Sequence, residues 1–260
     1  MNILQQIVKH KRQEVAARKR NVSVSDFQSM EFFNRKSISL RKSLMKTKPF
    51  AIIAEVKRSS PSGGVLLRNA SHTEIAHDFE SNGAAGISVL TDHKYFSGSI
   101  DDLSDIRKLV SLPLLRKDFI IDEHQVYEAK AFGADAILLI ASILETNQLK
   151  ELHLLATELD LECLVELYEE NEIDKLDFDV IKLVGINNRD LKTFTIDLNR
   201  SLTLSRNISR DVTLVSESGI QSSDDIKRLL DAGIHSALIG EHFMKAEHPG
   251  QALKQLLDSI

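Results

Sequence analysis

From residue 51 onward, short runs of apolar residues alternate with longer segments in which apolar residues recur every three or four positions. The short runs predict buried strands, and the longer segments predict amphipathic helices. Strands are expected near 51–56, 86–90, 113–117, 136–140, 161–166, 181–186, 212–216 and 236–239. Helices are expected near 72–82, 102–110, 123–132, 146–159, 169–175, 197–205, 223–231 and 249–258. Because a helix follows each strand, the pattern predicts parallel strands joined by helical crossovers.

Eight such units favour a closed α/β barrel, the (β/α)8 or TIM barrel, over an open doubly wound sheet. No linker, charge block or low-complexity stretch divides the chain, so we expect one domain over residues 1–260. Residues 1–48 are expected to form an N-terminal helical extension with helices near 3–18 and 39–45, and residues 49–260 the barrel. We interpret the basic first helix as a solvated helix against the body of the fold. The alternative is a role in steering a substrate.

The composition is that of an ordinary globular protein, since 42% of the 260 residues are hydrophobic and 27% are charged. A formal net charge of −5 argues against a nucleic acid or a membrane surface as the main partner. No apolar window is long enough to span a membrane, and the first twenty residues lack the apolar core of a signal peptide. The single cysteine excludes an intrachain disulfide framework. These features predict a cytoplasmic protein.

The strand ends carry the candidate chemistry, because active sites of such barrels lie at the carboxyl ends of the strands. In the first strand, Glu55 and Lys57 stand two positions apart and therefore point to the same side. Other strand ends add Lys117, Glu166, Asn187 and Glu217. Burying so many charges is costly unless they pair, and pairing shifts their pKa values, which suits proton transfer. For any one of these residues, the alternative is an ion pair that closes the barrel rim.

The last two strands predict a phosphate site. Ser218 and Gly219 follow the seventh strand, and Gly240 follows the eighth. Loops at these two places, with a helix amino terminus, form the usual phosphate site of this fold. The chain contains no Walker loop, no GxGxxG or GxSxG motif, and no histidine spacing typical of a metal site. Cys163 lies within a predicted strand and is interpreted as a buried, inert thiol.

Eight of these runs, taken in order, resemble one enzyme family, indole-3-glycerol phosphate synthase. They are IIAEVKRSSPSGG, SVLTDHKYFSGS, PLLRKDFI, GADAILLI, CLVEL, GINNRDL, VSESGI and ALIGEHFM. The opening ILQQIVKHKRQEVAARK is similar to the extra amino-terminal helix of that family. The resemblance implies ring closure of 1-(2-carboxyphenylamino)-1-deoxyribulose 5-phosphate to indole-3-glycerol phosphate, with release of carbon dioxide and water, in tryptophan biosynthesis. It implies no metal and no organic cofactor.

The resemblance also implies a role for each matching residue. Lys117 is the acid at the ketone oxygen, Glu166 the base, and Lys57 the partner acid in dehydration and a contact for the substrate carboxylate; which lysine serves which step stays open. Glu55 and Asn187 hold hydroxyls and the catalytic charges. The residues expected to bind the substrate are Phe119 on the aromatic ring, Arg189 at the anthranilate carboxylate, Glu217, and, around the phosphate, Ser60, Ser218, Gly219, Gly240 and Glu241.

One position departs from some members of the family. Many have a small hydroxyl residue after the glycine that corresponds to Gly240, whereas this chain has Glu241. A carboxylate beside a phosphate would repel it, so we expect the Glu241 side chain to turn outward and only its backbone N–H to contact the ligand.

Two other functions stay open at this point. A barrel similar to phosphoribosylanthranilate isomerase would share the phosphate site but would need a cysteine and an aspartate as base and acid. A non-catalytic phosphosugar-binding barrel would need the glycine turns but not Lys117 facing Glu166. The sequence also leaves open whether another enzyme of the tryptophan pathway docks on this one.

Overall fold

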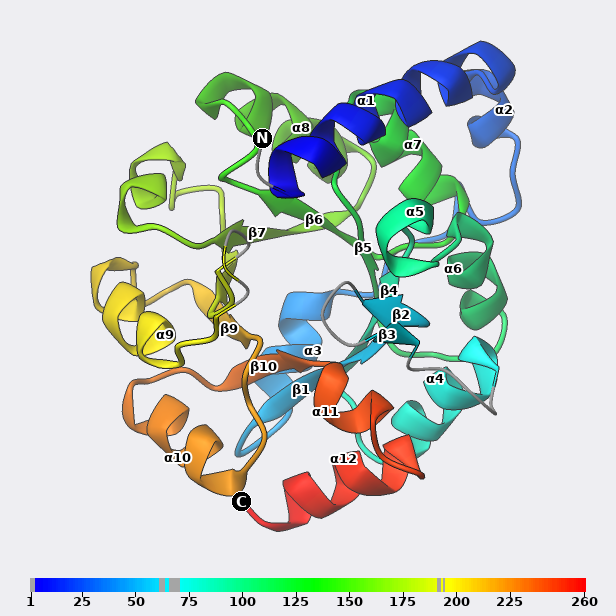
Figure 1. Ribbon diagram of the computed structural model, residues 1–260. Coiled ribbons are helices and arrows are strands. Elements are labelled where there is room, and N and C mark those ends of the chain that lie inside the picture. The colour runs from blue at the N-terminus through cyan, green and yellow to red at the C-terminus, as the bar shows by residue number, and fades with distance from the viewer. Residues whose placement is uncertain (1–2, 61–63, 66–70, 191–192, 194) are drawn as a thin grey trace.

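Eight parallel strands close into a barrel in a computed structural model that describes residues 3–60, 64–65, 71–190, 193 and 195–260 (Figure 1). The strand order around the barrel is β1-β10-β9-β8-β7-β6-β5-β4, and every neighbouring pair is parallel. This confirms the predicted (β/α)8 barrel. The strands are β1 Ala51–Val56, β4 Gly86–Leu90, β5 Leu114–Lys117, β6 Ala136–Ile140, β7 Glu162–Leu167, β8 Leu183–Asn187, β9 Thr213–Glu217 and β10 Ser236–Ile239.

A ring of helices surrounds the barrel (Figure 1). Local sequence features mark the starts of two of them: Ser71 and Glu74 form a capping box at the first ring helix, and Pro249 occupies the first turn of the last. The longer helices are α4 His72–Ser81, α6 Ile100–Arg107, α7 Glu123–Ala131, α8 Thr146–Glu158, α9 Asn199–Leu204, α10 Ser223–Asp231 and α12 Pro249–Asp258.

Four local features differ from the sequence prediction. The segment expected as a helix near 169–175 is a 3₁₀ helix, η1 Glu170–Lys175, and the helix expected at 197–205 ends in a second one, η2 Ser205–Asn207. The loop after β1 contains a short antiparallel pair, β2 Ser59–Ser60 with β3 Gly64–Val65. Three short helices were also not expected, α2 Val24–Gln28, α5 His93–Phe96 and α11 Glu241–Met244. Pieces of one or two turns are too short to leave a periodic signal.

The barrel interior is layered, and this layering positions the site. Because side chains alternate along a strand, every second residue of a barrel strand points inward. Ile53, Leu115, Leu164 and Val215 share one buried apolar cluster inside the barrel. Two residues further along the same strands stand Glu55, Lys117, Glu166 and Glu217. The apolar layer is therefore the floor on which the charged residues of the carboxyl end rest.

The N-terminal extension touches both ends of the barrel. Helix α3, Leu40–Lys46, covers the amino end, where Leu40 and Leu44 join the interior cluster. Helix α1, Ile3–Asn21, lies at the carboxyl end, where Ile7 packs in the same cluster as Phe119. Figure 1 shows α1 along the rim beside α7 and α8, with the short α2, Val24–Gln28, after it.

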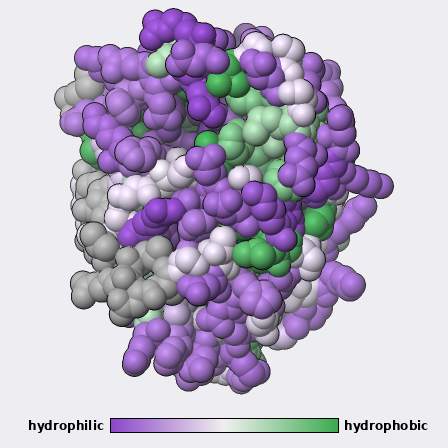
Figure 2. Space-filling model, turned by 90° about the vertical axis from the view of Figure 1, so that its right-hand side faces the viewer, coloured by the Kyte–Doolittle hydropathy of each residue, from purple (hydrophilic) through white to green (hydrophobic). Residues whose placement is uncertain are grey.

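Most of the face shown in Figure 2 is hydrophilic, with hydrophobic residues in a limited area. Large exposed hydrophobic side chains are scattered along the chain: Met45, Leu109, Leu154, Val180, Ile196 and Ile260. In the described part of the chain, no helix has both the length and the apolar character needed to cross a membrane.

Candidate active site

The carboxyl mouth of the barrel holds two adjoining cavities of different character. The first is lined largely by apolar side chains from α1 and from several strand ends. The second lies against the turns after β9 and β10, where Gly219 and Gly240 stand. The residues that line both cavities are Glu55, Lys57, Lys117, Arg189, Ser218 and Glu241. A ligand with an apolar ring at one end and an anion at the other would place its middle at these charged residues.

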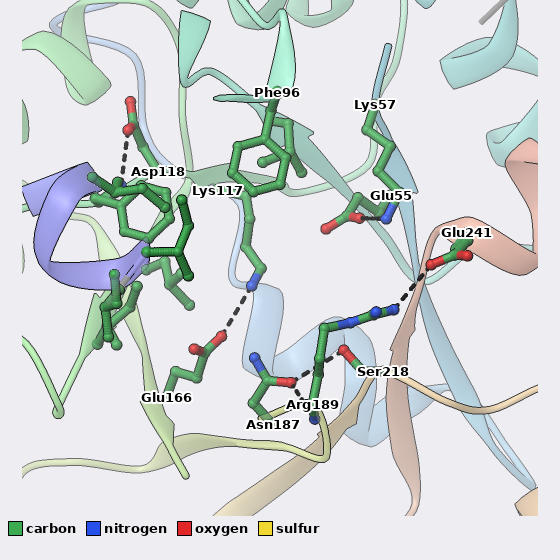
Figure 3. Close-up of a pocket in the computed structure, with 17 residues that line it drawn as sticks. Glu55, Lys57, Phe96, Lys117, Asp118, Glu166, Asn187, Arg189, Ser218 and Glu241 are labelled. Carbon is green, nitrogen blue, oxygen red and sulfur yellow. Dashed lines mark hydrogen bonds and ion pairs between the residues drawn. The ribbon is translucent and has the colours of Figure 1, made fainter. Parts of the chain in front are cut away.

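Lys117 lies at the centre of this mouth (Figure 3). Its Nζ is 3.0 Å from Glu166 Oε2 and 2.9 Å from Glu217 Oε2. Burial alone would lower the pKa of Lys117, but the two glutamates outweigh burial and raise it above the usual lysine value. The group is therefore a fixed ammonium. Its side chain is 14% exposed, so a ligand in the cavity can reach it.

Glu217, the second carboxyl partner of Lys117, has a raised pKa. Burial raises its pKa to about 8; Lys117 opposes this shift, while the neighbouring Glu166 adds to it. Its place depends on Gly185, on the facing strand β8: a Cβ atom at Gly185 would lie 2.1 Å from Glu217 Oε1. Gly185, which sequence reasoning did not single out, thus makes room for Glu217.

Glu55 and Lys57 point to the same side of β1 as predicted, and Lys57 Nζ lies 2.7 Å from Glu55 Oε1. Gly240 is part of the same arrangement, because a Cβ atom there would lie 2.5 Å from Glu55 Oε1. The sequence assigned Gly240 to a phosphate site. The structure adds a steric reason for glycine, namely the space that the Glu55 carboxylate fills.

Asn187, at the end of β8, links the two halves of the mouth. Its Oδ1 accepts hydrogen bonds from the backbone N–H of Arg189 at 3.0 Å and from Ser218 Oγ at 3.1 Å. Ser218 and Gly219 have φ angles of 71° and 85°, a left-handed turn that side chains rarely adopt. The turn places Ser218 and Gly219 at the second cavity. The side chain of Ser60, the remaining residue expected at the phosphate, lies outside the part that the structure describes.

Glu241 differs from its expected position. Its side chain lines both cavities instead of turning outward. Arg189 Nη2 lies 2.9 Å from Glu241 Oε2 (Figure 3). Lys245 Nζ lies 2.6 Å from Glu241 Oε1. The hydrogen bond from Lys245 is the main reason that the pKa of Glu241 is lowered. Lys245, four residues further along the chain, and Arg189, which a sequence does not reveal as a neighbour, hold this carboxylate at the mouth.

The apolar cavity contains Phe119, as expected, together with residues that sequence reasoning missed. Phe96 lies beside Phe119, with ring centroids 6.2 Å apart. Phe96 follows the second barrel strand closely, so its position on a strand-end loop was a usable signal. The other missed lining residues are Asp118 and six apolar residues: Ile3, Leu4 and Ile7 of α1, with Leu90, Leu138 and Ile140 at strand ends. Here α1 is a wall of the site and not only a solvated helix.

Among the described residues, neither a reactive thiol nor a cluster of metal ligands lies at the mouth. Cys163 belongs to β7 and packs in the outer cluster between barrel and helices, and burial raises the pKa of its thiol. It is therefore buried and inert, as predicted. Among the described residues, no group of three or more His, Cys, Asp or Glu side chains is arranged to hold a metal ion.

Solved structures of low sequence identity share the fold. Thiamine phosphate pyrophosphorylase from Pyrococcus furiosus superposes with a TM-score of 0.61 at 16% identity, covering 85% of this chain and 96% of that one. The tryptophan synthase α subunit from Legionella pneumophila gives 0.61 at 12% identity, covering 85% and 95%. At these identities the likeness concerns the barrel alone.

Sequence comparison is more specific. Residues 4–256 match the family model of indole-3-glycerol phosphate synthase. The chain is 45% identical over 258 residues to the indole-3-glycerol phosphate synthase of Salinibacter ruber, covering 98% of this chain and 95% of that one. It is 43% identical over 261 residues to the enzyme of Carboxydothermus hydrogenoformans, covering 98% and 99%. The chain belongs to the indole-3-glycerol phosphate synthase family.

Proposed function

We propose that the mouth of the barrel closes the indole ring with Lys117 as the acid at the ketone oxygen. As a member of its family, the protein is a carboxy-lyase of tryptophan biosynthesis that acts on 1-(2-carboxyphenylamino)-1-deoxyribulose 5-phosphate. The observation that supports the proposal most is the place of the Lys117 ammonium, between two carboxylates and at the junction of an apolar and a glycine-lined cavity.

The two cavities suggest how the substrate lies. The anthranilate ring would occupy the apolar cavity, between Phe119 and the residues of α1. The phosphate would lie at Ser218, Gly219 and Gly240, with Ser60 as a further contact implied by family resemblance. In this orientation the ketone of the sugar lies near Lys117. Arg189 lines both cavities and is assigned to the anthranilate carboxylate, and substrate binding would then compete with its ion pair to Glu241.

Ring closure joins the ring carbon that bears the carboxylate to the ketone carbon. The electron pair of the aniline ring forms the carbon–carbon bond, and the ketone oxygen takes a proton from Lys117 Nζ. A preformed ammonium stabilises the negative charge that develops on this oxygen. Glu166 and Glu217 hold the ammonium in place, so that it needs no reorientation during the reaction.

Loss of carbon dioxide and water completes the reaction. The bond to the carboxylate breaks, carbon dioxide leaves, and its electron pair restores the ring. The new alcohol then leaves as water with a proton from Lys57, while Glu166 removes a proton from the substrate. Glu55, whose Oε1 lies 2.7 Å from Lys57 Nζ, orients this second lysine, and Asn187 holds substrate hydroxyls.

The test is to mix the protein with the anthranilate phosphosugar and to follow indole fluorescence together with release of carbon dioxide. We expect both signals to rise at the same rate. Binding without either signal would favour the non-catalytic phosphosugar-binding barrel. Conversion of phosphoribosylanthranilate, without carbon dioxide, would favour the isomerase-like alternative.

Two broader features are proposed with this function. The chain is treated as one domain, with residues 1–48 as an extension of the barrel at 49–260, and unfolding in a single transition would support this. A cytoplasmic location is inferred from the lone cysteine and the ordinary composition. Contact with another enzyme of the pathway is a separate question, which co-purification would address.

A further inference from the structure

A second buried lysine lies on α1, away from the residues assigned to the reaction. Lys11 is 0% exposed. Its Nζ lies 2.8 Å from Asp92 Oδ2, 2.9 Å from Asp118 Oδ1 and 3.1 Å from Glu14 Oε1. Both aspartates are themselves buried. A fully buried lysine is rare unless it is paired, so this arrangement requires an account.

On its own helix, Lys11 follows the residues that form a wall of the apolar cavity. Leu4, Ile7 and Lys11 are spaced three and four residues apart and therefore lie on one face of α1. Leu4 and Ile7 line the cavity, together with Ile3 at the start of the helix. Lys11 thus fixes the half of α1 that faces the substrate site. The other half has separate ties, such as the ion pair of Arg18 with Glu128 at 2.8 Å.

The two aspartates bound by Lys11 each accept a hydrogen bond from the segment that carries one of the phenylalanines of the cavity. Asp118 Oδ1 accepts the backbone N–H of Phe119 at 2.8 Å. Asp92 is the N-cap of α5 and accepts the backbone N–H of Tyr95 at 2.8 Å, and the next residue of that helix is Phe96. Lys11 therefore connects the three parts of the apolar wall: the start of α1, the turn that carries Phe96, and the end of β5 that carries Phe119.

We propose that Lys11 is a positioning residue that assembles the ring-binding half of the substrate site. The inference rests on the proposed function, because it assigns that half to the anthranilate ring. Lys117 is held separately, by Glu166 and Glu217, although it directly precedes Asp118 in the chain. Loss of Lys11 therefore affects binding of the ring far more than proton transfer at the ketone.

The experiment compares Lys11→Met with Lys19→Met on the same helix. Lys19 also joins α1 to the barrel, through Asp122 at 3.0 Å, but this pair is exposed and far from the cavity lining. In Lys11→Met we expect KM to rise about tenfold to a hundredfold, while kcat falls less than about threefold. In Lys19→Met we expect both constants to stay unchanged. A purely structural role for Lys11 would instead lower the active fraction, and so kcat, at constant KM.

A second readout uses ribulose 5-phosphate, which has the phosphosugar but no aromatic ring, as an inhibitor. We expect its inhibition constant to be the same in wild type and Lys11→Met. If Lys11→Met does not fold, Asp92→Asn carries the test, because asparagine also caps a helix but does not attract Lys11; its KM should rise by a smaller factor.

An unchanged KM in a folded Lys11→Met or in Asp92→Asn would overturn the inference, and so would an equal loss of affinity for ribulose 5-phosphate. Absence of turnover in the wild-type protein would instead contradict the proposed function, so the two failures are distinguishable.

Discussion

Strand β5 ends at Lys117, and the next residue, Asp118, binds Lys11; comparison of these two ammonium groups distinguishes a reactive lysine from a structural one. Lys117 and Lys11 each lie within 3.0 Å of two buried carboxylates. In both, carboxylates overcome the effect of burial and raise the pKa. The difference is access: the side chain of Lys117 is 14% exposed at a cavity, whereas that of Lys11 is 1% exposed. A charged cluster becomes a reactive site only where a substrate can replace one of its partners.

The largest effect that follows from this comparison is expected for Lys117→Met. Removal of an acid that acts mainly in the transition state lowers kcat by about 10²- to 10⁴-fold. Binding of the substrate, followed by fluorescence quenching or calorimetry, should be retained. Near-normal turnover in this variant would show that Lys117 is not the acid.

Glu166→Gln is expected to have the next largest effect, because it removes the proposed base. The expected loss in kcat is about 10²-fold or more. Glu162→Gln is a matched control: it lies on the same strand and the same inward face, but at the amino end, where it accepts hydrogen bonds from Ser39 Oγ at 2.5 Å and the Arg41 N–H at 2.8 Å. The control should lose stability and keep its kcat. Equal kcat losses in the two variants would contradict a catalytic role for Glu166, because they would show that the loss does not depend on which end of the barrel is changed.

The third prediction concerns the stability of the Lys11 cluster. Lys11→Met removes the cation from the buried Asp92 and leaves the buried Asp118 with Arg116 alone, which should cost about 3 kcal/mol of unfolding free energy at pH 7. Burial opposes ionisation of Asp118, but Lys11 and Arg116 lower its pKa below the usual value, so its stabilising effect is present above the unfolded pKa and is lost as the pH falls. The difference between wild type and variant in urea unfolding should therefore shrink toward pH 3. A difference that is independent of pH would contradict the ionic account.

The smallest expected effect is a change in pH profile for Glu217→Gln. Burial raises the pKa of Glu217 from its ordinary value of 4.5 to about 8, so the protonated carboxyl stabilises the fold at low pH, and this contribution is lost as the pH rises from about 4.5 to about 8. Ionisation above pH 8 also adds negative charge beside Lys117 and weakens it as an acid. We expect kcat/KM of the wild type to fall several-fold above pH 8 and the variant to lack this limb. If the variant shows the same fall in kcat/KM above pH 8, the fall is caused by ionisation of a group other than Glu217.

Much of the fold and of the charged centre follows from the sequence, because both depend on local periodicity. The eight apolar runs predict the barrel, and alternation along a strand places Glu55 and Lys57 on one side. The expectation that Lys117 and Glu166 converge needs only the rule that strand ends meet at one mouth. These predictions need only the spacing of residues a few positions apart and the rule that the strand ends of a barrel meet at one mouth.

The rest depends on contacts between distant segments. Nothing near Lys11 in the sequence indicates that Asp92 and Asp118 lie within 3 Å of it. The ion pair of Glu241 with Arg189 joins the start of α11 to a residue 52 positions earlier, just after β8, and it keeps the Glu241 side chain at the mouth instead of in the expected outward position. Such pairs are set by the packing of helices and loops on the barrel, which periodicity does not encode.

Because Gly185 lies so close to Glu217, a substitution at one of these positions is tolerated only with a matching substitution at the other. Gly185→Ala would force the Glu217 carboxylate away from Lys117, because the new methyl group would occupy its place. Substitution of Glu217 by a smaller side chain would free that same volume and remove the steric clash with an alanine at position 185. Relatives with a residue larger than glycine at the position of Gly185 should therefore have a side chain shorter than glutamate at the position of Glu217. Such covariation would arise because the two side chains compete for one volume, and not because both take part in the reaction.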